Sequence, residues 1–194
     1  MLNRRPLVEF LLAERPDDLL VVSGLGSSTW DVTAAGDDPR NFCFIGAMGQ
    51  AGPFALGLAM AQPDKRVLLI TGDGELLMGL GVLATIANED PMNLAIAVMD
   101  NGAYVETGGQ ATATAGRTDL EMVAKGAGIS ATRTVRDESE LPALRDWFYT
   151  ASGPVLANIK IVPEALPLVF PHSFDGVTAM NRFRDAATTE VAAG

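Results

Sequence analysis

Short apolar runs alternate with longer segments of mixed polarity along most of the chain. The apolar runs are rich in Leu, Ile and Val, and their lengths are typical of buried strands. They lie at 19–22, 67–71, 94–99 and 155–162. A short extended segment is also predicted at 42–45 and an edge-like strand at 131–135. The segments between them predict helices at 4–15, 50–61, 75–88, 118–126 and 137–150. Because strands and helices alternate, the pattern predicts an α/β fold, a three-layer, doubly wound parallel sheet.

Polar residues at three of the predicted helix starts are suited to capping. Asp137 is followed three positions later by Glu140, which is the spacing of a capping box. Thr118 is expected to cap the helix that follows it, and Ser27 or Ser28 is expected to cap the helix after the first strand.

Residues 163–194 differ from the rest of the chain. Prolines at 163, 167 and 171 exclude a regular element over that span, and a helix is predicted at 176–187. We therefore predict a domain of residues 1–162 and a C-terminal extension, 163–194, that could pack on a partner subunit. The end of the extension, 188–194, is expected to be partly ordered.

Polar residues also follow two of the predicted strands, at the rim where open parallel sheets bind ligands. Gly72-Asp73-Gly74 follows the strand 67–71, and Asp100-Asn101 follows the strand 94–99. A helix N-terminus suits phosphate, but the carboxylate of Asp73 requires a hard cation between itself and a phosphate. Mg²⁺ prefers oxygen ligands, which Asp73, Asn101 and the carbonyl of Ala103 can supply. The two strand ends therefore predict a diphosphate–magnesium site.

The arrangement resembles the thiamine diphosphate motif, with Gly72-Asp73-Gly74 at one end and Asp100-Asn101 at the other. Asp100 stands where the family usually has Asn, whereas Asn101 keeps the metal-binding position. The loop from Gly46 to Ala51 is also similar to the family's. The resemblance implies that the Gly46 carbonyl binds the cofactor's 4′-amino group and that Met48 supports its bent conformation. It covers roughly residues 20–160 and implies a thiamine diphosphate-binding fold.

The resemblance, together with the rim position, implies a set of cofactor-binding residues. They are Gly26, Ser27, Gly46, Met48, Gly72, Asp73, Gly74, Glu75, Asn101, Ala103 and Tyr104, of which Asp73, Asn101 and Ala103 also bind the metal. The backbone amides of Gly74 and Glu75 are expected to meet the diphosphate.

The stretch 104–110, Tyr-Val-Glu-Thr-Gly-Gly-Gln, most resembles small decarboxylase subunits that act on sulfopyruvate or phosphonopyruvate. This implies non-oxidative decarboxylation of a small 2-oxo acid, with thiamine diphosphate and Mg²⁺ as cofactors. Glu106 is the nearby candidate for substrate contact or proton transfer. His172, the only histidine, is a second catalytic candidate. The Gly- and Thr-rich loop 102–117 is expected to be surface-exposed and to close over a ligand.

Family members activate the cofactor with a glutamate from a separate pyrimidine-binding domain, across a subunit interface. The chain has room for one doubly wound domain, which we assign to the diphosphate side. A pyrimidine-binding (alpha) subunit is therefore the expected partner, in a hetero-oligomer of two alpha and two beta subunits or larger. The small residues of the predicted helix 50–61 suit a subunit interface.

Two other functions stay open at this point. An acetolactate synthase-type carboligase subunit would join a second carbonyl compound to the decarboxylated fragment, and a non-catalytic regulatory subunit would keep the fold without turnover. A dinucleotide-binding fold is discounted, because Thr29 stands where its third glycine is needed after Gly24 and Gly26. A ferredoxin-coupled oxidoreductase would need more cysteines than Cys43, unless its iron–sulfur clusters lie on other chains.

Composition narrows the possible partners and locations. A formal net charge of −10 argues against nucleic-acid binding, and no apolar run reaches the ~20 residues of a membrane helix. The N-terminal segment contains Glu9 and Glu14 and is expected to be a helix and not a secretory signal. Cys43 is expected to be a buried small hydrophobe. These features predict a cytoplasmic protein.

Overall fold

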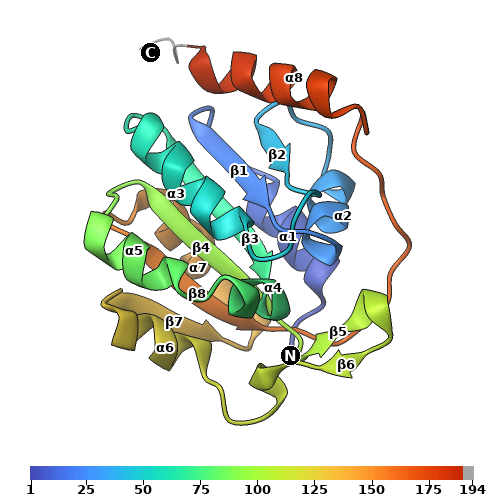
Figure 1. Ribbon diagram of the computed structural model, residues 1–194, viewed down its shortest axis with the longest axis vertical. Coiled ribbons are helices and arrows are strands. Elements are labelled where there is room, and N and C mark those ends of the chain that lie inside the picture. The colour runs from blue at the N-terminus through green and yellow to red at the C-terminus, as the bar shows by residue number, and fades with distance from the viewer. Residues whose placement is uncertain (190–194) are drawn as a thin grey trace.

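A six-stranded, all-parallel sheet forms the centre of the computed structural model, which describes residues 1–189 (Figure 1). The strand order is β2-β1-β3-β4-β8-β7. The strands are β1 (Leu19–Ser23), β2 (Asn41–Cys43), β3 (Arg66–Gly72), β4 (Leu94–Asp100), β7 (Ala131–Val135) and β8 (Val155–Lys160). Every predicted strand is present within a few residues of its expected bounds, and β7 lies at the sheet edge.

Helices cover both faces of the sheet, which confirms the three-layer prediction (Figure 1). The helices are α1 (Arg4–Leu12), α2 (Ser27–Ala34), α3 (Ala51–Ala61), α4 (Asp73–Met78), α5 (Val82–Glu89), α6 (Leu120–Ala127), α7 (Leu141–Thr150) and α8 (Gly176–Thr188). Buried residues of α1, α2 and α7 form one core with the sheet, and those of α3, α5 and α6 form the other.

The central strands contribute side chains to both cores. Along β3, Leu68 and Ile70 belong to the core under α1 and α7, whereas Val67 and Leu69 belong to the core under α3 and α5. Parallel strands that are covered on both faces need apolar residues at successive positions. This burial explains why the sequence shows continuous apolar runs there and not a polar–apolar alternation.

The helix predicted at 75–88 is wrong, because the structure divides this segment into α4 and α5. Residues 79–81 form a turn between the two helices. A Cβ atom built on Gly79 would lie 2.2 Å from the backbone oxygen of Gly49. The turn is therefore packed against a loop distant in sequence, which the local residue pattern does not reveal.

Of the predicted helix caps, the capping box is confirmed, but it caps the 3₁₀ turn η3 (Glu138–Glu140), and α7 begins only at Leu141. Asp137 accepts a hydrogen bond from the Ser139 backbone N–H at 2.9 Å, and Glu140 accepts one from the Asp137 N–H at 3.0 Å. The cap of α6 is Asp119 and not Thr118, with the Met122 N–H donating to the Asp119 carboxylate at 3.1 Å.

The prediction that Ser27 or Ser28 caps α2 is also wrong. The N-cap of α2 is Gly26, with φ at +79°, and it makes no side-chain capping bond. Ser27 is the first residue of the helix, and its hydroxyl donates to the carboxylate of Glu106 instead.

The C-terminal extension folds back on its own chain within the described residues. No regular element spans 163–175, and α8 follows, as predicted. The irregular segment passes beside α2 before it enters α8 (Figure 1). Phe183 of α8 packs against Phe42 of β2, with 5.2 Å between ring centroids. Packing on a partner subunit stays a prediction, and residues 190–194 of the predicted tail lie outside the described residues.

Cys43, which was expected to be buried, is half-buried. Its burial raises the pKa of the thiol, which favours the neutral form. Within residues 1–189, no helix is long and apolar enough to cross a membrane.

Candidate active site

The carboxyl ends of β1, β3 and β4 meet at one rim of the sheet, where the chain connections reverse direction. The chain leaves β1 for β2 on one side and returns to β3 on the other side of β1. Such a switch point leaves a crevice for ligands. Here it forms a cavity of about 380 Å³, within the usual size range of small-molecule sites.

Most of the predicted site residues line this cavity. They are Gly26, Ser27, Met48, Gly72, Asp73, Gly74, Glu75, Asn101, Ala103, Tyr104 and Glu106. Gly46 and His172 do not line it. The rim position of the two motif segments is therefore as the sequence predicts.

Asp73 is the first residue of α4 and is buried. Its Oδ2 atom accepts hydrogen bonds from the Thr112 hydroxyl at 2.5 Å and from the Thr114 hydroxyl at 2.6 Å. Within the described part of the chain both bonds end on Oδ2, which leaves Oδ1 for another ligand. The loop 102–117 is thus tied to Asp73. The sequence motif does not identify either threonine as a site residue. The threonine content of this loop was the only feature of the sequence that pointed to them.

Asn101 offers a second oxygen to the same cavity. Its side-chain Oδ1 accepts a hydrogen bond from the Ala103 backbone N–H at 2.9 Å, which orients the amide. Ala103 begins β5 (Ala103–Tyr104), which pairs antiparallel with β6 (Gln110–Ala111). Residues 1–189 contain no group of three or more His, Cys, Asp or Glu side chains that could hold a metal ion. One carboxylate with neutral amide and carbonyl oxygens fits Mg²⁺, a hard cation.

The glycine at 74 is required by a close contact. A Cβ atom there would lie 2.2 Å from Cε1 of the Tyr104 ring. At Gly72, by contrast, an added Cβ atom would meet nothing within 4 Å. The ring of Tyr104 therefore lies directly over the N-terminal turn of α4, and the space beside Gly72 is left open.

Glu75 is buried beneath the loop that follows β1. Its Oε2 accepts a hydrogen bond from the Thr71 hydroxyl at 2.9 Å, and a Cβ atom on Gly24 would lie 1.6 Å from the same oxygen. Burial raises the pKa of the Glu75 carboxyl, and the Thr71 hydrogen bond opposes that rise. The diphosphate contact predicted for this residue uses its backbone amide and does not depend on the charge of the side chain.

The raised pKa of Glu75 predicts a pH-dependent stability. The folded chain keeps this proton to higher pH than the unfolded chain, so the free energy of unfolding falls as pH rises above the ordinary glutamate pKa of 4.5. Glu75→Gln is expected to make the protein more stable than the parent at pH 7 and equally stable near pH 4. Denaturant unfolding across this range tests it, with the exposed Glu89→Gln as control; a difference that does not change with pH would contradict it.

Glu106 reaches across the cavity from the 3₁₀ turn η1 (Val105–Thr107) to α2. Its Oε1 accepts hydrogen bonds from the Trp30 indole N–H at 2.8 Å and from the Ser27 hydroxyl at 3.0 Å. Trp30 was not among the predicted site residues. No motif marks it, because its partner lies 76 positions away.

A buried ion pair forms part of the cavity wall. Arg4 donates through Nη1 to Asp31 Oδ2 at 2.5 Å and to the Ser27 backbone oxygen at 3.0 Å. Arg5 donates to the other Asp31 oxygen at 3.0 Å. Among the described residues that line the cavity, Arg4 is the one basic side chain, and Asp31 balances its charge. The described residues therefore supply no basic side chain to the cavity that lacks an acidic partner.

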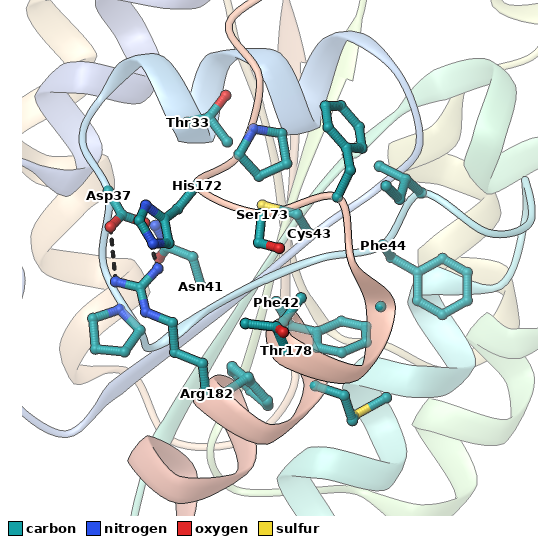
Figure 2. A pocket seen from close by; sticks show the side chains of 18 of the residues that line it. Thr33, Asp37, Asn41, Phe42, Cys43, Phe44, His172, Ser173, Thr178 and Arg182 are labelled. Atoms are coloured by element: carbon teal, nitrogen blue, oxygen red, sulfur yellow. Dashed lines mark hydrogen bonds and ion pairs between the residues drawn. The ribbon is translucent and has the colours of Figure 1, made fainter.

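His172 and Gly46 line a second cavity, of about 280 Å³, between β2 and the extension. Figure 2 shows His172 beside the pair formed by Asp37 and Arg182, whose two hydrogen bonds measure 2.6 and 2.8 Å. The structure does not bring His172 together with Asp73. The roles assigned to His172 and Gly46 stay predictions.

Comparison with known proteins agrees with the fold. Residues 25–159 match the family described as "Thiamine pyrophosphate enzyme, C-terminal TPP binding domain". The chain therefore belongs to this family of thiamine diphosphate-binding domains.

The chain is also similar to individual proteins of known name. It is 37% identical over 84% of its length to "Sulfopyruvate decarboxylase subunit beta" of Methanothermobacter thermautotrophicus, covering 84% of that protein. It is also 37% identical over 96% of its length to "Phosphonopyruvate decarboxylase" of Streptomyces viridochromogenes, of which it spans 47%. The fold also matches a solved structure from Mycobacterium smegmatis, which is assigned provisionally to the thiamin diphosphate-dependent enzymes. The match covers 84% of this chain and 32% of the other chain, with a TM-score of 0.68 and 24% identity.

Proposed function

We propose that the chain is the diphosphate- and Mg²⁺-binding part of a thiamine diphosphate-dependent 2-oxo acid decarboxylase. The observation that supports this most is the convergence of Asp73 and Asn101 on one cavity at the switch point of the sheet. The two decarboxylases named above favour this reaction over an acetolactate synthase-type carboligation. We also place the protein in the cytoplasm.

The residues of this chain have separate roles in the proposal. Asp73, the Asn101 side-chain oxygen and the Ala103 carbonyl hold Mg²⁺, and the amides of Gly74 and Glu75 face the diphosphate. The bound cofactor supplies the electron sink for breaking the bond to the carboxylate carbon. Glu106 lies at the same cavity and is the group of this chain that contacts the substrate or moves a proton.

The substrate proposed is a small 2-oxo acid of the sulfopyruvate or phosphonopyruvate type. A sulfonate or phosphonate group requires a basic partner in the pocket. Arg4 is already paired with Asp31. Arg117, Lys125 and Arg133, which are near the motif in sequence, do not line the cavity. We therefore assign the cation that recognises this group to a second subunit.

A pyrimidine-binding alpha subunit is the proposed partner, and the beta-subunit name of the Methanothermobacter relative supports this. The face formed by α3 and α5 suits the contact, since Leu56 and Met60 of α3 and Val82 of α5 line a groove there and Met60 is 54% exposed. Exposed apolar side chains that line a groove often mark an interface.

A charge placed on this face should weaken the assembly. Met60→Glu is expected to raise the dissociation constant of the two-subunit complex about tenfold or more, because a carboxylate would be buried in the interface. The matched control is Met122→Glu on α6, where the methionine is 64% exposed. Size-exclusion chromatography and analytical ultracentrifugation measure both; equal assembly of the two variants would refute this placement.

The proposal is tested by calorimetric titration of thiamine diphosphate, with and without Mg²⁺, into this chain and into the two-subunit complex. Tight, Mg²⁺-dependent binding in the complex, followed by CO₂ release from sulfopyruvate or phosphonopyruvate, is the expected result. Absence of binding in both samples would overturn the cofactor assignment. Binding without release of CO₂ from any 2-oxo acid would favour the non-catalytic subunit.

A further inference from the structure

Trp30 connects the active-site cavity to the C-terminal extension. On one side its indole N–H donates to Glu106 Oε1 at 2.8 Å. On the other side its ring packs against the ring of Phe170, with centroids 5.5 Å apart and an interplanar angle of 83°. Such an edge-to-face contact is a favoured geometry for aromatic pairs. One side chain thus touches both a site residue and the extension.

The extension is fastened to the first two helices close to this contact. Arg5 Nη2 donates to the Pro167 backbone oxygen at 2.8 Å, and the Thr33 hydroxyl donates to the backbone oxygen of Val169. Arg5 also bonds Asp31 on α2. The segment 167–170 is therefore held along α2, and its position determines where the Phe170 ring lies.

Glu106 depends on these contacts for its orientation. It lies on a turn between two strands of only two residues each, and it is an exposed, rotatable side chain. In the described residues its carboxylate is held by the Trp30 and Ser27 donors of α2. An indole has few torsions, and a ring packed against it restricts them further, so its N–H keeps a fixed direction.

We propose that Trp30 is a positioning residue that fixes the Glu106 carboxylate in the active site, and that Phe170 of the extension holds Trp30 in place. This rests on the proposed function, in which Glu106 contacts the substrate or moves a proton. The C-terminal extension then contributes to turnover through Phe170 and Trp30, without lining the cofactor cavity itself.

The test is a set of variants in the assembled complex, with sulfopyruvate and phosphonopyruvate as substrates. Trp30→Phe keeps a ring beside Phe170 but removes the N–H donor, so kcat is expected to fall about tenfold or more, while the Kd for thiamine diphosphate stays unchanged. Phe170→Ala is expected to lower kcat by a smaller factor, about threefold. Val177→Ala and Trp147→Phe are the controls and should leave kcat unchanged, since Val177 is 70% exposed on α8 and Trp147 pairs with Phe148 on α7.

A double-mutant cycle separates positioning from a general structural effect. If Trp30 acts through Glu106, Trp30→Phe should cause no further loss of kcat in a Glu106→Gln background. Losses that multiply in the double variant would overturn the proposal. So would a Trp30→Phe enzyme with the parent kcat, or one whose cofactor Kd rises as steeply as its kcat falls.

Fluorescence gives a readout that is independent of turnover. In a Trp147→Phe background Trp30 is the only tryptophan. Its emission is expected to shift on Phe170→Ala and on Glu106→Gln, and to stay unchanged on Val177→Ala, since Val177 is exposed on α8. An emission insensitive to both of the first two changes would overturn the proposal. A complex that binds no thiamine diphosphate would instead overturn the proposed function and leave the Trp30 contacts to be decided by these spectra.

Discussion

Replacement of Asp73 by asparagine is expected to weaken Mg²⁺-dependent binding of thiamine diphosphate at least about a hundredfold. Loss of an outer partner of a metal ligand alone typically costs 10–100-fold in affinity, and Asp73 is assigned as a ligand itself. Decarboxylation by the complex is expected to fall by at least the same factor. Calorimetric titration and steady-state kinetics measure the two losses.

The same substitution should not harm the fold. Without a cation, Asp73 is a buried carboxylate stabilised by the hydroxyls of Thr112 and Thr114. An asparagine oxygen can accept the same two hydrogen bonds without a buried charge, so the free energy of unfolding should be equal or about 1 kcal/mol higher. Asp90→Asn, an identical chemical change at the exposed C-cap of α5, is the control. Unchanged cofactor affinity in the Asp73 variant would refute the metal site.

Gly74→Ala is expected to destabilise the protein by about 1–3 kcal/mol and to weaken cofactor binding as well. The new methyl group would lie 2.2 Å from the ring of Tyr104, which is far inside contact distance, so the ring must turn away or β5 must shift. Since Ala103 precedes Tyr104 in β5, a shift of β5 would displace its carbonyl from the metal site, and a turned ring would change the cavity wall that Tyr104 forms. Denaturant unfolding and calorimetry measure the two effects.

The neighbouring glycine supplies the control for this clash. Gly72→Ala has open space around the added Cβ atom and an ordinary φ of −88°, so its free energy of unfolding should change little. In a Tyr104→Ala background, Gly74→Ala should lose most of its cost, since the obstructing ring is gone. If the cost at Gly74 is the same with and without the Tyr104 ring, the clash is not its cause.

The sheet was predictable because of the way it is buried. Strands covered on both faces, such as β3 and β4, need consecutive apolar residues, and this pattern is visible in a single sequence. Helix ends were less predictable, because several residues near each end are able to cap. Thr118 and Asp119 are both suitable by type, and only the backbone geometry selects Asp119.

The break between α4 and α5 shows a different limit. Residues 75–88 favour a single helix by composition, and the turn at 79–81 forms where the Gly49 loop approaches Gly79. The two segments are far apart along the chain. A local pattern contains no information about which loop will be packed against a helix, so the break could not be read from it.

The sequence by itself determined the α/β class, the strand positions and the motif residues Gly72–Gly74 and Asn101, because these depend on local patterns and on the common rim of parallel strand ends. The tertiary structure decided which other side chains serve the site. Thr112, Thr114 and Trp30 lie 39, 41 and 76 positions from the carboxylates they bond. It also separated His172 from Asp73, since the extension folds over β2 and not over the cofactor cavity. Contacts between distant segments arise from packing, and packing is settled only when the whole chain is folded.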